Sequence, residues 1–358
     1  MRFPEFSGEW KRVELKDVAE FQKSRIPADS LDASCYISTE NLIPNFGGIK
    51  EASSIPTDGN VMAIKPNDIL ISNIRPYLKK VWQSDRFGGC SADVFVLRTT
   101  RCQSDFLYNI IASDKFINYA MSGAKGVKMP RGDKRQMEEF EFSIPAIEEQ
   151  NRISRLLSLL DERIATQNKI IEKLQSLIKG LRVCCMQRVY GNNVYLSEIA
   201  QIYQPQTISS TELTEDGFLV YGANGIIGKY KDYNHETEQI CITCRGNTCG
   251  MVNYTKPMSW ITGNAMVINT DKYQDKVCKR YLYHYLSAYN FNSIISGSGQ
   301  PQIVRTPLEK LKITLPTISE QKQKAIIFDK IQDKIDINHK VLNLYIGQKQ
   351  YLLRQMFI

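Results

Sequence analysis

The sequence lacks the short signatures by which many enzymes are recognised. It contains no GxxxxGK[ST] loop for a nucleoside triphosphate, no HExxH zinc motif and no GxSxG nucleophile elbow. It also has only three histidines, His235, His284 and His339, which are well separated in the chain. Because Ser/His and Cys/His arrangements need a histidine beside the nucleophile, the sequence offers little material for nucleophilic catalysis.

Long apolar runs are also missing. No apolar stretch approaches the roughly 20 residues that a membrane-spanning helix needs, and the opening residues MRFPEF show no apolar core of a signal peptide. The nine cysteines are an odd number and stand singly or in close pairs such as Cys184-Cys185. This spacing is not that of a disulfide framework, so we expect a protein of the reducing cytoplasm.

Two short motifs suggest ligand sites, and each has a plainer explanation. Residues 222–228 read GANGIIG, but the spacing GxxGxxG differs from the dinucleotide fingerprint and no βαβ pattern surrounds it. Cys241 and Cys244, with Cys249 and Cys278 further on, offer four zinc ligands. However, Cys241 lies in an apolar strand-like run, and only one CxxC pair exists. We therefore expect neither a cofactor nor a metal ion bound to this chain.

The sequence does contain a long proline-free segment, residues 148–189, with apolar residues at alternating steps of three and four. This is the heptad pattern of a coiled-coil seam. A helix of about 40 residues is about 60 Å long, which is longer than the core of a compact domain needs. The seam residues that we single out here are Leu157, Leu160, Ile164, Gln167, Ile171 and Leu174.

The C-terminal end repeats this design. Residues 319–357 form a second proline-free heptad pattern, and the two segments follow similar entries, IPAIEEQ at 144–150 and LPTISEQ at 315–321. An offset of about 171 positions aligns them and places the polar break Gln167 on Asn338. Since a polar seam residue fixes register at a cost in stability, we expect an antiparallel pair with these side chains opposite each other. The alternative is two unrelated helices, each packed on its own domain. The second set of seam residues is Phe328, Ile331, Ile335, Asn338, Leu342 and Tyr345.

The segments before the two helices also correspond. Each begins with a similar run, VELKDVAEF at 13–21 and VYLSEIAQ at 194–201, and continues with short β-rich runs separated by turn residues. A helical pattern follows at 104–121 in the first segment and near 279–286 in the second. A repeat of this length indicates a duplicated domain rather than a solenoid. We thus predict an α+β fold with an internal pseudo-twofold duplication. It has a mixed α/β domain at 1–145, a long helix at 146–190, a second such domain at 191–315 and a final helix at 316–358.

Basic and amide side chains gather in the loops of both globular segments. The net charge of +8 favours a polyanionic partner. Arginine, lysine, asparagine and glutamine read base edges in DNA, whereas hydroxyls and backbone N–H groups hold phosphates. Solvated turns of similar composition are the plainer alternative. In the first segment the candidate DNA-contacting residues are Arg75, Tyr77, Lys79, Lys80, Lys125, Lys128, Arg131, Lys134 and Arg135. In the second segment they are Tyr221, Asn224, Lys229, Tyr230, Arg245, Asn247, Thr248, Gln300, Gln302 and Arg305.

Taken together, these features resemble the specificity subunit of type I restriction–modification systems. The resemblance rests on the opening RFPEF with Trp10, the LKDVA and LSEIA entries, DILIS at 68–72, YGANGIIG at 221–228, RGN at 245–247, PxIxEQ before each long helix and the terminal QMF. It spans essentially the whole chain, and the duplicated order is more specific than any single motif. The CITC run at 241–244 and the pair Cys184-Cys185 depart from the usual pattern.

The resemblance implies a non-catalytic subunit with two target-recognition domains, each reading one half of a bipartite sequence in double-stranded DNA. The two long helices would form an antiparallel coiled coil that sets the spacing between the half-sites and docks methyltransferase subunits. A restriction subunit would join in complexes that cleave. AdoMet, ATP and Mg²⁺ would bind to those partner subunits. The rival interpretation is a helical scaffold whose two globular domains bind protein partners, and a third is a nucleic-acid enzyme with its own active site.

Overall fold

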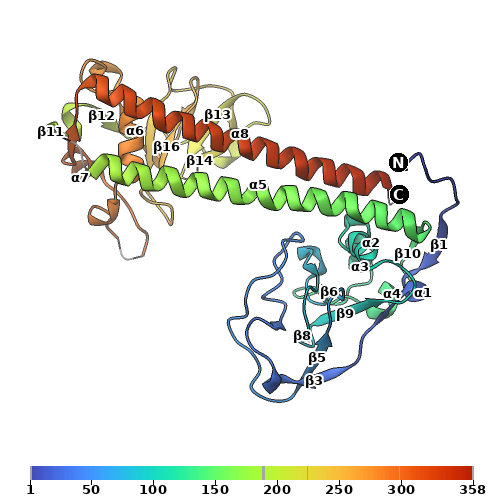
Figure 1. The fold of residues 1–358 in the computed structure, drawn as a ribbon. Coiled ribbons are helices and arrows are strands. Elements are labelled where there is room, and N and C mark those ends of the chain that lie inside the picture. Colours follow the sequence, from blue (N-terminus) through green and yellow to red (C-terminus); the bar gives the residue numbers. More distant parts are fainter. Residues whose placement is uncertain (1, 188–189, 224, 298, 357–358) are drawn as a thin grey trace. The chain divides into compact units, whose positions relative to one another are not determined.

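The computed structural model describes residues 2–187, 190–223, 225–297 and 299–356, and it divides into two compact units (Figure 1). Unit 1 contains the chain up to Thr166 together with the residues from Leu342 onward, and unit 2 contains Gln167–Val341. Helices α5 (Ile147–Gln187) and α8 (Ile318–Met356) each contribute to both units. Each unit therefore combines one globular segment with part of each long helix.

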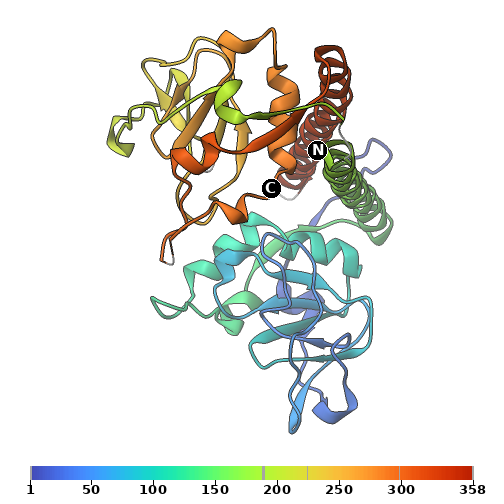
Figure 2. The same ribbon diagram turned by 90° about the vertical axis from the view of Figure 1, so that its left-hand side faces the viewer.

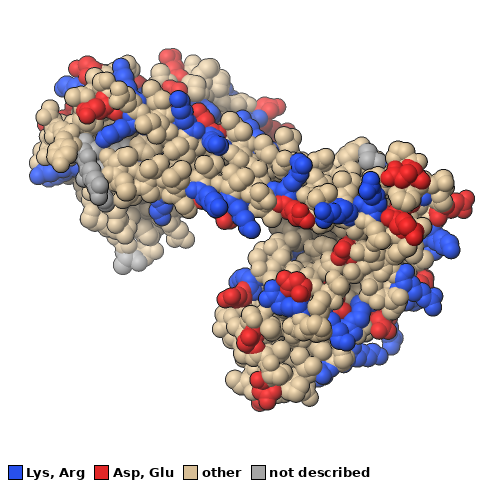
Figure 3. All heavy atoms as spheres, in the orientation of Figure 1, with Lys and Arg blue, Asp and Glu red and all other residues tan. Residues whose placement is uncertain are grey.

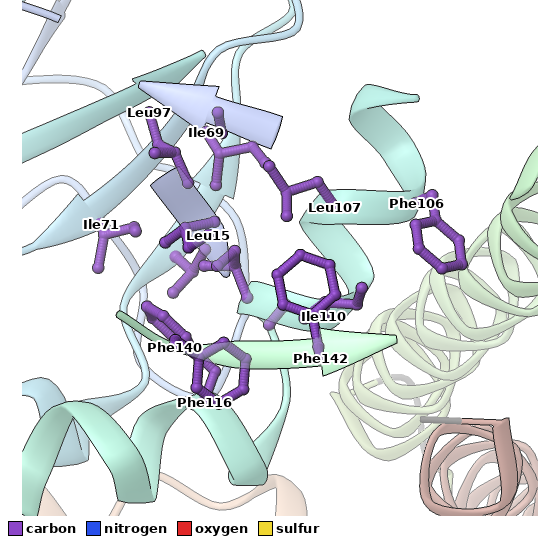
Figure 4. Close-up of a cluster of buried hydrophobic side chains, with 14 of the residues drawn as sticks. Leu15, Ile69, Ile71, Leu97, Phe106, Leu107, Ile110, Phe116, Phe140 and Phe142 are labelled. Carbon is purple, nitrogen blue, oxygen red and sulfur yellow. The ribbon is translucent and has the colours of Figure 1, made fainter. Parts of the chain in front are cut away.

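Unit 1 is built around a four-stranded antiparallel sheet in the order β2-β9-β6-β7. Side chains alternate along a strand, so Ile69 and Ile71 of β6 face one side of this sheet and Leu70 faces the other; all three are buried. Ile69 and Ile71 pack with residues of the helices (Figure 4), whereas Leu70 packs with the second sheet, β3-β5-β8-β4. The bounds are β2 (Ala19–Phe21), β3 (Arg25–Pro27), β4 (Tyr36–Ile37), β5 (Asn60–Ile64), β6 (Ile69–Ser72), β7 (Val81–Gln83), β8 (Gly88–Cys90) and β9 (Val94–Thr99).

The helical pattern expected as one element at 104–121 is two helices, α2 (Ser104–Ile111) and α3 (Asp114–Ser122). The Ser113 hydroxyl accepts a hydrogen bond from the Phe116 N–H at 3.3 Å and so starts a new helix. The Gln103 side chain caps α2 in the same way, through the Phe106 N–H. Phe106 points from α2 toward α5 (Figure 4). The remaining elements of unit 1 are β1 (Lys11–Glu14), α1 (Leu15–Val18), α4 (Lys134–Glu138) and β10 (Glu141–Ile144), which pairs with β1.

Unit 2 repeats this plan, with a central antiparallel sheet in the equivalent order β12-β18-β15-β16. Strand β15 is fully buried, and its Cys241 faces a second sheet, β14-β13-β17. The bounds are β11 (Asn192–Tyr195), β12 (Gln201–Tyr203), β13 (Phe218–Gly222), β14 (Gly225–Tyr230), β15 (Ile240–Thr243), β16 (Val252–Tyr254), β17 (Trp260–Ile261), β18 (Ala265–Asn269), α6 (Lys279–Ala288), α7 (Arg305–Glu309) and β19 (Lys312–Leu315).

The two units share a frame, which consists of the central sheet with the helices and strands that follow it, and they differ in their second sheets. Within the described residues, unit 2 has the single helix α6 where unit 1 has α2 and α3. Strand β6 and β15, helices α4 and α7, and strands β10 and β19 lie 171 positions apart, the same offset that separates Gln167 from Asn338. The segment that connects β2 to β6 in unit 1 covers residues 22–68, and the segment that connects β12 to β15 in unit 2 covers residues 204–239, so the two differ in length. This segment builds most of the second sheet, which has four strands in unit 1 and three in unit 2. The duplication therefore preserves the central sheet and its order but not the second sheet.

Within unit 2, the segments of α5 and α8 pair through an apolar seam with one polar contact. The Gln167 Nε2 donates to Asn338 Oδ1 at 2.5 Å and to the Asn338 carbonyl oxygen at 3.2 Å. Ile178, Phe328 and Ile335 share one buried cluster. Gln167 and Asn338, the two polar residues that interrupt the apolar seam, are thus in contact, as the sequence predicts.

Within unit 1, the end of α8 lies beside the start of α5 (Figures 1 and 2). The Lys349 Nζ lies 2.6 and 2.7 Å from the two carboxylate oxygens of Asp161. Leu352 and Met356 pack in the same buried cluster as Leu157. In both units, higher residue numbers on α8 face lower numbers on α5, so the coiled coil is antiparallel.

The predicted seam residues occupy buried or half-buried positions. The buried ones are Leu157, Leu160, Gln167, Ile171, Phe328 and Ile335. The half-buried ones are Ile164, Leu174, Ile331, Asn338, Leu342 and Tyr345. No helix in the described part of the chain combines the length and apolar character needed to cross a membrane.

A buried polar network also joins α5, α6 and α8 in unit 2. His284 of α6 is fully buried, and its Nε2 lies 2.8 Å from Asp329 Oδ1 on α8. Arg182 of α5 donates from Nε to His284 Nδ1 at 3.1 Å, and Arg280 Nε donates to Asp329 Oδ2 at 3.1 Å. Because an arginine donates to Nδ1, the imidazole is neutral and carries its proton on Nε2. The rings of Phe328 and Tyr283 enclose the imidazole, so its protonation would bury a new cation.

The amide pair generates a test of the seam. Gln167→Ala or Asn338→Ala leaves the partner amide without its contact, and we expect a loss of about 1–3 kcal/mol in the free energy of unfolding. Replacing both with leucine should be neutral or stabilising, because both polar groups leave the seam together. Urea unfolding of the four variants in a double-mutant cycle measures this coupling. Additive single effects would show that the amides do not interact.

The histidine network predicts a pH dependence of stability. Burial lowers the pKa of His284, so the unfolded chain binds a proton more readily than the folded one. Neutral His284 therefore contributes fully to the stability of the folded chain above the ordinary histidine pKa of about 6.5, and this contribution decreases as the pH falls below that value. Thermal melting between pH 8 and 5 should show a decrease that is smaller in His284→Gln, whereas the exposed His339→Gln should behave like wild type. A His284→Gln profile identical to wild type would contradict this role. His235, also in unit 2, has a pKa lowered by burial and accounts for part of the remaining slope.

Candidate functional site

In unit 1, two loops meet at the end of strand β6. The first, residues 73–80, follows β6, and the second, residues 123–133, precedes α4. The backbone N–H of Arg75 donates to the Pro130 carbonyl oxygen at 2.8 Å, and that of Gly132 donates to the Asn73 oxygen at 3.0 Å. These bonds join the loops into one surface, which we call loop surface 1.

Unit 2 builds the same surface at the end of β15 from residues 244–248, 296–297 and 299–303. The Gly246 N–H donates to the Pro301 oxygen at 2.9 Å, and the Ile303 N–H donates to the Cys244 oxygen at 3.0 Å. Each of these atoms is the counterpart of one in unit 1 at the offset of 171. We call this pair of loops loop surface 2. Both surfaces therefore follow from the duplicated frame.

Loop surface 1 contains unusual backbone conformations. Arg75 and Lys79 flank the short 3-10 helix η2 (Pro76–Leu78) with φ angles of 52° and 55°, in the left-handed region. A third loop adjoins them, because the N–H groups of Asn45 and Phe46 donate to the carbonyl oxygens of Leu78 and Lys79. Asn45 and Phe46 are also left-handed. Such conformations cost about 1–2 kcal/mol per non-glycine residue and concentrate at functional sites.

Several predicted cations of loop surface 1 are held by acceptors of the same unit. Lys79 pairs with Asp114 at 2.6 Å, and the Lys80 Nζ donates to the Thr39 carbonyl oxygen at 2.5 Å. The remaining held cations are Lys125 with Asp133, Arg131 with Asp93, and Lys134, whose Nζ lies 5.1 Å from the Phe21 ring centroid. Exposed ion pairs of this kind contribute little to stability. A polyanion can therefore displace the carboxylates at small cost.

Four predicted residues of unit 1 are free. Within the described chain, no side-chain hydrogen bond or ion pair involves Arg75, Tyr77, Lys128 or Arg135, and all four are exposed. Burial lowers the pKa of Lys80, and nearby Lys50 and Arg75 lower it further against the opposing effect of Glu40. The cations of this surface therefore lie close enough to repel one another. Figure 3 shows basic and acidic side chains mixed over the visible face of unit 1.

The predicted residues of unit 2 divide in a similar way. Arg245, Asn247, Gln300 and Gln302 are exposed on loop surface 2. Others have partners within the unit: Thr248 with the Ala223 carbonyl oxygen, Arg305 with Glu309, Lys229 with Asp216, and Tyr230 with the Trp260 ring. Tyr221 is buried, and its hydroxyl accepts a hydrogen bond from the Lys256 N–H. Asn224 lies outside the described residues. The exposed candidates on loop surface 2 therefore come from both of its loops: Arg245 and Asn247 from the first, and Gln300 and Gln302 from the second.

The two weak ligand motifs have structural roles. Gly222 and Gly225 pair across the antiparallel β13–β14 hairpin, and the described residues around it form no βαβ unit. Burial raises the pKa of the Cys241 thiol to about 12, which opposes the thiolate form that zinc binds. The described chain contains no group of three His, Cys, Asp or Glu side chains arranged to hold a metal ion.

Residues that sequence reasoning did not single out anchor each frame to its long helix. The Gln150 Oε1 accepts from the Gln103 N–H at 2.9 Å, and the Gln321 Oε1 accepts from the Cys278 N–H at 2.8 Å. Each glutamine therefore ties the start of a long helix to the start of α2 or α6. The PxIxEQ motif, which ends in Gln150 and Gln321 and occurs before both long helices, is the sequence feature that could have identified these anchoring glutamines. The neighbouring Glu149 is buried and holds Arg2 through two hydrogen bonds of 2.8 and 2.7 Å.

A family model described as the type I restriction modification DNA specificity domain matches the chain twice, at residues 7–176 and 192–344. Each match covers one globular segment and continues into the following long helix. The two matches agree with the duplication seen in the frame.

Individual relatives give the same picture. The chain is 24% identical to the type I restriction enzyme MjaVIII specificity subunit of Methanocaldococcus jannaschii, over 95% of this chain and 89% of that protein. It is 31% identical to the EcoprrI specificity subunit of Escherichia coli, over 40% of this chain and 36% of that protein. Among solved structures, the S subunit of the type I restriction-modification system of M. genitalium matches with a TM-score of 0.67 at 17% identity. That match covers 98% of this chain and 96% of the other.

Proposed function

The chain belongs to the type I restriction–modification specificity subunits, the non-catalytic members of these systems, and we propose that each of its units reads one half of a bipartite DNA sequence. The observation that carries this proposal is the pair of loop surfaces. The same backbone hydrogen bonds build both, at one offset of 171, yet their exposed side chains differ. A frame used twice with different loops suits one task performed on two different sequences.

The side chains on these surfaces have the chemistry of DNA recognition. Arg75 and Arg245 present a planar fork that matches the guanine edge in the major groove, and Asn247, Gln300 and Gln302 present amides that match adenine. Lys128 and Arg135 supply charges for phosphates. The differing stretches, residues 22–68 in unit 1 and the described residues 204–223 and 225–239 in unit 2, lie beside the central sheets and would extend each surface.

We propose that the long helices set the distance between the half-sites. A rigid helix of 41 residues is about 60 Å long, which corresponds to about 17–18 base pairs at 3.4 Å each. Two readers held by such a pair would contact half-sites separated by unread base pairs. The polar seam pair supports this role, because a register shift would change the separation.

The helices also offer a docking surface for methyltransferase subunits. In unit 2, Ile170, Leu177 and Ile337 are 38%, 49% and 58% exposed. Ile170 and Leu177 each come one position before a seam residue of α5, and Ile337 comes two positions after the seam residue Ile335 of α8. In an antiparallel pair these heptad positions lie on the same side. Ala325 and Asp329 lie on the other side of α8, against the globular part of unit 2.

In unit 1, Leu344 and Tyr351 of α8 hold the same heptad position as Ile337 and are 72% and 55% exposed. Exposed apolar side chains gathered on one side of a helix pair suit the packing of further helices. In the view of Figure 3, charged side chains of both signs are scattered along α5 and α8 with uncharged surface between them. AdoMet, and ATP with Mg²⁺ where cleavage occurs, would bind to the docked subunits. A complex of this kind acts on DNA in the cytoplasm.

Selection from a duplex library tests the reading function. The full-length chain is incubated with duplexes that carry two randomised blocks and spacers of several lengths, at 50 and 200 mM salt. We expect one bipartite sequence with a fixed spacer, bound at least tenfold more weakly at the higher salt because phosphate contacts release counterions. Absence of a selected sequence together with salt-independent binding would favour the protein scaffold. Methylation or cleavage by the chain alone would favour an enzyme.

Substitutions on the exposed apolar side test docking. Ile337→Glu combined with Leu344→Glu should weaken association with the co-expressed methyltransferase subunit by about tenfold or more, because docking would bury both charges. The melting temperature of the isolated chain should change little, since both side chains are exposed. Ile346→Glu, on the opposite side of the same helix, is the matched control. Equal effects of the two changes would place the docking site elsewhere.

A further inference from the structure

The loop after the central strand has the same left-handed backbone in both units, but only unit 1 carries a side chain there. Arg75 has φ 52° and ψ 63°, and its N–H donates to the Pro130 carbonyl oxygen. Its counterpart at the offset of 171 is Gly246, with φ 87° and an N–H that donates to Pro301. Glycine adopts this region freely, whereas an L side chain is strained in it. The loop therefore requires the conformation, and Arg75 adopts it against its own preference.

Nothing in unit 1 accounts for the side chain of Arg75. It is exposed, and within the described residues it makes no hydrogen bond or ion pair. Its neighbours Lys79 and Lys80 are both held, by Asp114 and by the Thr39 carbonyl oxygen. Lys80 also lies within electrostatic range of Arg75. Arg75 is thus an unneutralised cation beside another cation, with all five of its donors available.

Position and chemistry together point to base reading rather than to phosphate binding. A phosphate contact needs only a charge, which a flexible lysine on an unstrained residue supplies. A bidentate contact with the O6 and N7 atoms of guanine needs a planar fork that starts from a fixed backbone. Pro130 and η2 hold the backbone of Arg75 on both sides. Strain retained at an exposed residue suits a role that depends on orientation.

We infer that Arg75 reads a guanine in the half-site bound by unit 1 and so determines specificity there. The inference rests on the proposed reading function and goes beyond it by naming the residue and the base. Unit 2 presents Arg245 one position earlier in its loop, where its backbone bridges to Gln302. Arg245 is the counterpart of Ile74, whose backbone bridges to Arg131. The two arginines therefore leave their loops from different positions, which suits two half-sites with different sequences.

The test compares Arg75→Gly with wild type on the selected bipartite duplex and on its single-base-pair variants. Arg75→Gly installs the residue of the repeat, so the full-length chain should melt at the same or a higher temperature. Binding to the selected duplex should weaken about 5- to 150-fold, and discrimination should disappear at one G·C pair of one half-site only. The other half-site should be read as before. Arg75→Lys, which keeps the charge and loses the fork, should lose the same discrimination.

Other results overturn the inference. An equal loss of affinity on every variant duplex would make Arg75 a phosphate contact, and Lys128→Ala on the same surface provides the comparison for such a uniform loss. Unchanged affinity, or full discrimination by Arg75→Lys, would also refute it. If the wild-type chain selects no bipartite sequence at all, the proposed reading function fails first. That failure is distinguishable because it precedes any comparison of variants.

Discussion

The single register of the α5–α8 seam is the constraint on which the rest of this structure depends. An apolar heptad seam tolerates a shift by one heptad, but the amide pair of buried Gln167 and half-buried Asn338 is satisfied in one register only. The Arg182–His284–Asp329 hydrogen-bond network is a second set of polar contacts that joins α5 to α8, through α6, in unit 2. Gln150 and Gln321 then tie each globular frame to the start of its helix. The position of each loop surface along its helix is therefore defined by polar contacts, while apolar packing supplies the stability.

The duplication separates what must stay constant from what is free to change. The central sheet, the short helices α4 and α7, and the hydrogen bonds to Pro130 and Pro301 recur in both units. The second sheets and the exposed loop side chains differ. If the loop surfaces read DNA as proposed, new loops would alter the sequence that is read without disturbing the seam. The strain at Arg75 fits the same division within one loop: the backbone shape recurs in both units, and we propose that the side chain serves DNA reading.

Much of the frame could be predicted from the sequence, because heptad periodicity and a constant offset are local patterns. The two long helices, their antiparallel pairing and the contact of Gln167 with Asn338 follow from those patterns alone. Features set by tertiary contacts were beyond reach. The break between α2 and α3 depends on the cap formed by Ser113, and the burial of Tyr221 depends on sheet packing. The ion pairs of Lys79 and Arg131 join residues distant in sequence. The left-handed backbone of Arg75 became meaningful only beside Gly246 in the same loop.

The claim that each unit reads its own half-site is tested most directly by making the two units alike. Residues 192–315 are replaced by residues 11–144, which begin and end at the equivalent strands β1 and β10. The variant is first shown to unfold cooperatively, and it is then expressed with the methyltransferase subunit before the host DNA is sequenced for methylated bases. The account predicts methylation of a site with two inverted copies of the first half-site, because the paired helices are antiparallel. Methylation that still includes the original second half-site would contradict it.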